Sequence, residues 1–147
     1  MGYALFAQRK LVLNNQISAT ELQQTQRSNE QYFLATQSSG LQQQLSSLLS
    51  SQALELQPLY ERLANAADSN ERARIQAEIQ EMQNMHKLEE EKINRQIYQI
   101  GINESALEME VKRLDTKLTA LMKQLEAVEE AEGKAIERAT PNFSGQG

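Results

Sequence analysis

The feature that most constrains this chain is a series of apolar residues that alternate in spacings of four and three between Leu107 and Val128. The same heptad spacing can be followed backward through three isoleucines. These ten residues, which we call the C-terminal seam, are Ile93, Ile97, Ile100, Leu107, Val111, Leu114, Leu118, Leu121, Leu125 and Val128. On an α-helix they fall on one narrow face, which is stable when it packs against another helix. The spacing therefore predicts a helix-packing interface at these ten residues.

The composition favours a helical protein that buries a stripe rather than a thick core. Aromatic residues make up 5% of the 147 residues, Trp is absent, and the mean hydropathy is -0.62. The hydrophobic content of 39% is nevertheless too high for a typical disordered chain. We therefore expect an elongated all-α protein.

The net charge of -5 and the sequence pI of about 5.0 disfavour binding to nucleic acid or to an anionic membrane surface. No apolar run approaches the roughly 18–20 residues that a membrane span requires. The first residues lack the order of basic, apolar and small residues that marks a secretory signal. We expect a soluble protein, cytoplasmic or exported without a classical signal peptide, and the sequence does not identify its compartment.

Residues 1–67 form a Gln- and Ser-rich arm in which we expect helix. A capping-box spacing, Ser18 to Glu21, predicts a start near Ala19. Breaks are expected near Gly40 and near Pro58, where an interior proline removes a backbone donor. A second heptad-like series with one irregularity occupies the arm's second half, at Leu41, Leu45, Leu48, Gln52, Leu56, Leu59, Leu63 and Ala66.

A boundary near the middle of the chain separates this arm from a long helix over residues 68–139. Asp68 has the position of a helix N-cap, with Glu71 three residues later. No proline follows until Pro141, so the helix would extend for about 100 Å at 1.5 Å per residue. Residues 140–147 are expected to form a disordered tail.

The central turn predicts a long antiparallel helical hairpin, a coiled coil in which residue i lies roughly opposite residue 138 - i. This register places Leu59 near Ile79. It also places Arg9 and Lys10 beside an acidic cluster, whose members are Glu126, Glu129, Glu130 and Glu132. The charges and the apolar residues therefore favour the same register.

A parallel homodimer through residues 71–139 is poorly specified by the same heptads. Glu90, Glu104 and Glu132 fall at core positions and would each meet their own copy. Glu110 would meet Asp115 of the second helix. Antiparallel pairing within the chain, or a different helical partner, avoids these contacts between like charges.

Candidate catalytic or metal-binding residues are few. His86 is the single histidine; its neighbours Glu89 and Glu90 do not complete a helical metal site, so we interpret it as a polar seam position. The run Glu89–Glu91 is interpreted as a solvated helix face. Four of the five methionines, Met82, Met85, Met109 and Met122, are typical of irregular helix contacts. We expect no enzyme activity, no cofactor and no metal.

The sequence therefore predicts a non-enzymatic structural or adaptor protein that binds itself or a helical partner. Its lack of Cys and Trp and its Gln/Ser/Thr-rich first half resemble bacterial exported helical proteins such as flagellins. The expected hairpin also resembles the stalk proteins of type III and flagellar export systems. These resemblances of composition and layout imply a filament or secreted-assembly subunit. The alternative is a small cytosolic export chaperone or stalk protein that binds a client helix.

Elongation is a testable consequence of these patterns. We expect small-angle scattering to give a radius of gyration well above the roughly 15 Å of a globular chain of this length. A value near 15 Å would contradict the expectation.

Overall fold

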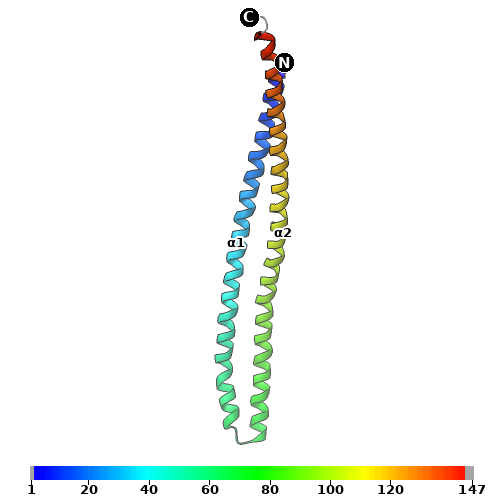
Figure 1. Cartoon of the computed structure of the whole chain (residues 1–147). Helices are drawn as coiled ribbons and strands as arrows, with labels where there is room; N and C mark the ends of the chain where they lie inside the picture. The colour runs from blue at the N-terminus through cyan, green and yellow to red at the C-terminus, as the bar shows by residue number, and fades with distance from the viewer. Residues whose placement is uncertain (1, 145–147) are drawn as a thin grey trace. The chain divides into compact units, whose positions relative to one another are not determined.

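The structure is a computed structural model that describes the backbone of residues 2–144 and the side chains of residues 2–139. It is all-α over these residues. Helix α1 covers Gly2–Asn65 and helix α2 covers Ser69–Ser144. The two helices pack against each other as a hairpin joined by one tight turn (Figure 1). The expected antiparallel helical hairpin is therefore confirmed.

The hairpin divides into two compact units, and both helices contribute to each. Unit 1 combines residues 1–31 with 106–147, and unit 2 consists of residues 32–105. Each unit is thus an antiparallel pair of helical segments, and unit 2 also contains the turn.

The turn of unit 2 is closed by backbone hydrogen bonds and a side-chain cap. The Ala66 N–H donates to the Leu63 carbonyl at 3.3 Å, at the end of α1. At the start of α2, the Asp68 carbonyl accepts the Arg72 N–H at 3.0 Å, and the Asp68 carboxylate accepts the Asn70 N–H at 3.1 Å. Asp68 is therefore the N-cap of α2, as its spacing predicts.

Removal of this cap should have a measurable cost. We expect Asp68→Ala to lower the free energy of unfolding by about 1 kcal/mol, because the Asn70 N–H loses its acceptor. Asp68→Asn keeps an oxygen at the same position and should cost much less. Chemical denaturation of both variants tests this, and equal losses would argue against a capping role.

The apolar core of unit 1 lies between the N-terminal part of α1 and the C-terminal part of α2. Leu13 and Ile17 of α1 cluster with Leu121 and Val128 of α2, all at most 9% exposed. Three half-buried residues pack against this cluster: Phe6, Leu118 and Leu125. Ile17 and Leu121 belong to this cluster, and their residue numbers add to 138, as the pairing of residue i with residue 138 - i requires. The predicted register therefore holds in this unit.

The apolar core of unit 2 adjoins the turn. Leu59 and Ala66 of α1 cluster with Ile75 and Ile79 of α2. Ile75 is only 1% exposed. Leu59 and Ile79 belong to the same cluster, which confirms their predicted proximity.

Helix α1 is more continuous than the sequence indicates. It begins at Gly2 rather than near Ala19, and it passes through both Gly40 and Pro58 without interruption. A Cβ at Gly40 would meet open space. Leu54, whose carbonyl loses its helical partner because Pro58 has no N–H, lies on the outward face of α1 at 68% exposure. Packing of the inward face against α2 outweighs these local costs.

The C-terminal end of α2 also differs from expectation. Its backbone remains helical through Ser144, so the tail predicted for residues 140–147 is helical over its first five residues. Residues 145–147 lie outside the described part of the chain. Within the described residues, neither helix contains an apolar stretch long enough to cross a membrane.

Candidate helix-packing surfaces

The C-terminal seam is covered by the hairpin itself. Four of its residues are buried, at 5% to 8% exposure: Ile93, Leu114, Leu121 and Val128. The other six are half-buried: Ile97, Ile100, Leu107, Val111, Leu118 and Leu125. Ile93, Ile97 and Ile100 belong to unit 2, and the remainder belong to unit 1. The structure therefore places all ten on the inward face of α2, and use of this face by a second protein stays a prediction.

Helix α1 carries a matching series of inward positions that sequence reasoning largely missed. This N-terminal seam alternates in spacings of four and three from Phe6 to Gln52, with every member buried or half-buried. Its members are Phe6, Lys10, Leu13, Ile17, Thr20, Gln24, Arg27, Gln31, Leu34, Ser38, Leu41, Leu45, Leu48 and Gln52. Polar residues occupy half of these positions, which hid the pattern from a search for apolar spacing alone.

Three large apolar residues of the arm lie on the outward face of α1. Leu22 is 59% exposed, Tyr32 77% and Phe33 61%. Leu34 is half-buried and belongs to the N-terminal seam. Counting Thr, Gln, Lys and Arg as tolerated seam residues would have recovered the correct face.

Two ion pairs join the helices of unit 1. The Lys10 ammonium lies 2.8 Å from a Glu132 carboxylate oxygen. The Arg27 guanidinium donates from Nε to Glu110 at 2.9 Å and also contacts Glu30 at 2.8 Å. The hydrogen bond and the charge of Glu110 raise the pKa of Arg27 above its ordinary value, with a smaller contribution from Glu30. Both pairs agree with the antiparallel register.

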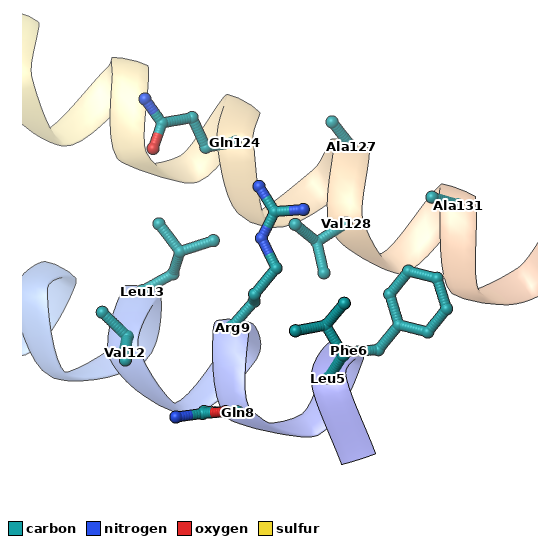
Figure 2. A pocket seen from close by; sticks show the side chains of 10 residues that line it. All are labelled: Leu5, Phe6, Gln8, Arg9, Val12, Leu13, Gln124, Ala127, Val128 and Ala131. Atoms are coloured by element: carbon teal, nitrogen blue, oxygen red, sulfur yellow. The ribbon is translucent and has the colours of Figure 1, made fainter. Parts of the chain in front are cut away.

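The acidic cluster expected beside Arg9 and Lys10 engages one of the two cations. Lys10 pairs with Glu132, whereas Arg9 forms no ion pair with any described side chain. Figure 2 shows Arg9 extending from α1 toward α2. Among the described side chains, the Arg9 guanidinium therefore has no ion-pair partner.

His86 occupies the inward face of unit 2 and is 6% exposed, which confirms its interpretation as a polar seam position. Its Nε2 lies 2.8 Å from a carboxylate oxygen of Glu55. The buried Gln52 amide donates to the His86 carbonyl oxygen at 3.1 Å. These contacts satisfy the polar atoms that the fold removes from water.

The described residues do not assemble a metal-binding group from three or more His, Asp or Glu side chains. Glu89 and Glu91 are exposed, and Glu90 is half-buried on the seam. The acidic run therefore lies partly on the solvated face and partly at the helix contact.

Shallow grooves run along the flanks of the hairpin. In unit 1, Leu5 and Val12 of α1 line a groove of about 530 Å³ with Ala127 and Ala131 of α2, and Arg9 lies within it (Figure 2). In unit 2, a groove of about 280 Å³ contains Met85 and His86 and is rimmed by four glutamates: Glu55, Glu78, Glu81 and Glu89. These two surfaces have opposite electrostatic character.

Comparison with known proteins identifies no relative: no protein family, no curated protein and no solved structure matches this chain.

Proposed function

We propose that this chain is a non-enzymatic structural or adaptor protein that assembles by packing its hairpin against other helices. The observation that carries the proposal is the distribution of apolar side chains. Among the described residues, seventeen large hydrophobic side chains are exposed, whereas ten hydrophobic residues are buried. The hairpin therefore leaves much of its apolar surface in water.

The geometry of a two-helix pair explains this excess. Each helix can bury only one stripe against its neighbour, so apolar residues on the flanks stay exposed. Burial of one such Leu or Val side chain contributes about 1.5–3 kcal/mol. A helix laid along either flank would bury several of them together, which is enough to support association.

The amino-acid composition is the basis for the biological setting that we propose. An acidic hairpin of helices without Cys or Trp suits a subunit of a bacterial filament or secreted assembly. Its net charge of -5 favours protein partners over nucleic acid. We assign no catalytic residue and no cofactor to this role.

A second candidate is a small export chaperone or stalk protein that binds a client helix. The open groove of unit 1 favours it, because the groove presents exposed apolar side chains, 57% for Leu5 and 49% for Val12, beside small alanines.

Fractionation of producing cells distinguishes the two roles. We expect an epitope-tagged chain to co-sediment with a high-molecular-mass assembly or to enter the medium. Recovery as a small, free cytosolic species that binds one client transiently would support the chaperone instead. A monomer without a partner in every fraction would contradict both.

A further inference from the structure

We infer that the groove of unit 1 binds an acidic amphipathic helix of another protein, which places a carboxylate on Arg9. The inference rests on the proposed helix-packing function and names the chemistry of the partner. The groove holds about 530 Å³ and lies between α1 and α2 beside the cluster of Leu13 and Val128.

The shape of the groove suits a helix. Leu5, Arg9 and Val12 are spaced by four and three residues along α1, so they form one longitudinal row. Ala127 and Ala131 form the facing row on α2, four residues apart. Their small side chains allow a third helix to approach closely, within the 8–10 Å that separates packed helices.

The charge of the groove selects the partner. Among the described residues that line it, Arg9 is the one charged residue and none carries a carboxylate, although the chain as a whole is acidic. Arg9 has no ion pair within the described residues. Glu130 of α2 lies outside the described lining of the groove and contacts Lys134 at 3.8 Å. A guanidinium left unpaired beside apolar side chains favours a carboxylate carried on an apolar helix face.

The same charge disfavours a second copy as the occupant. Two copies that met through this groove would bring two Arg9 side chains together, and neither lining would supply a carboxylate. Like charges in a partly desolvated contact are unfavourable. A different helix that carries a carboxylate can form an ion pair with Arg9, whereas a second copy of the groove offers Arg9 no carboxylate.

Fluorescence anisotropy with the full chain tests the inference. The probe is a dye-labelled helical peptide of about three heptads with one apolar face and a glutamate at the centre of that face. The matched control peptide carries lysine at the central position. We expect the acidic peptide to bind about tenfold more tightly than the basic one.

Two substitutions localise the effect. Arg9→Gln should abolish the preference for the acidic peptide, whereas Lys123→Gln, which removes the same charge from α2 outside the groove lining, should preserve it. Ala127→Trp fills the groove and should weaken both peptides at least about tenfold. Circular dichroism checks that each variant keeps its helix content.

Three results would each overturn the inference. These are equal affinity for the two peptides, a preference that persists in Arg9→Gln, and failure of the acidic peptide to bind. Sedimentation velocity without peptide adds a fourth: a dimer that Ala127→Trp dissociates would identify a second copy as the occupant. Failure here would leave the fractionation result unchanged, so it can be separated from failure of the proposed function.

Discussion

Leu114→Ala is expected to lower the free energy of unfolding by about 2–4 kcal/mol, because Leu114 is 5% exposed on the inward face of α2. Truncation removes buried apolar surface and leaves a cavity that the two helices can close only in part. Leu118→Ala, at a half-buried residue that packs against the core of unit 1, should cost a similar amount. Urea denaturation followed by circular dichroism measures both.

Leu22→Ala is the matched control, with the same residue type and the same substitution. Leu22 is 59% exposed on α1, so its truncation should change the free energy of unfolding by no more than about 0.5 kcal/mol. A larger loss at Leu22 than at Leu114 would show that the inward face has been wrongly assigned.

The second large effect concerns the separated helices. A fragment of residues 71–139 should not form a stable parallel homodimer at neutral pH. Its half-buried seam positions include Glu90, Glu104 and Glu132, and a parallel pairing would place each of them against its own copy. A fragment of residues 1–67 added in trans should restore helicity, because Lys10 pairs with Glu132 and Arg27 pairs with Glu110.

Circular dichroism and analytical ultracentrifugation of the two fragments, alone and mixed, provide the measurement. The mixture should be more helical than the sum of its parts and should sediment as a heterodimer. A fully helical dimer of residues 71–139 whose helicity and mass do not change when residues 1–67 are added would indicate an intermolecular zipper in place of the hairpin.

The helical class, the central turn and the register of the hairpin could be predicted from the sequence because α2 is locally consistent. Its apolar residues repeat at heptad spacing, and Asp68 supplies the N-cap signal immediately before it. The register followed from the position of the turn, and the cluster of Leu59 with Ile79 agrees with it. Each of these features depends on residues close together in the chain.

The course of α1 could not be predicted in the same way, because its structure depends on its partner helix. Thr20 is 2% exposed although it is polar, and its hydroxyl donates to the Gln16 carbonyl at 2.8 Å. Arg27 lies on the inward face because Glu110 stands opposite. Neither fact is visible in the composition of residues 1–40, where large apolar residues such as Leu22 and Phe33 lie on the outward face.

The groove on unit 1 was also beyond the reach of sequence reasoning. It requires residues from two segments more than a hundred positions apart to lie side by side, and it requires knowledge of which cations are already paired. The sequence placed Arg9 and Lys10 near the same acidic cluster. Only the geometry separates the paired Lys10 from the unpaired Arg9.

The contact of the buried His86 side chain with Glu55 has a consequence for the uniqueness of the fold in unit 2. Heptad surfaces are repetitive, so two such helices can in principle slide past each other by one repeat and still bury apolar residues. A slip of this kind would move the His86 side chain away from the Glu55 carboxylate, which lies 2.8 Å from its Nε2, and would set it against Leu45 or Leu59. A buried imidazole that loses its hydrogen-bond partner costs about 1–3 kcal/mol. This one polar contact therefore favours a single register of the two helices over registers that are shifted by one heptad.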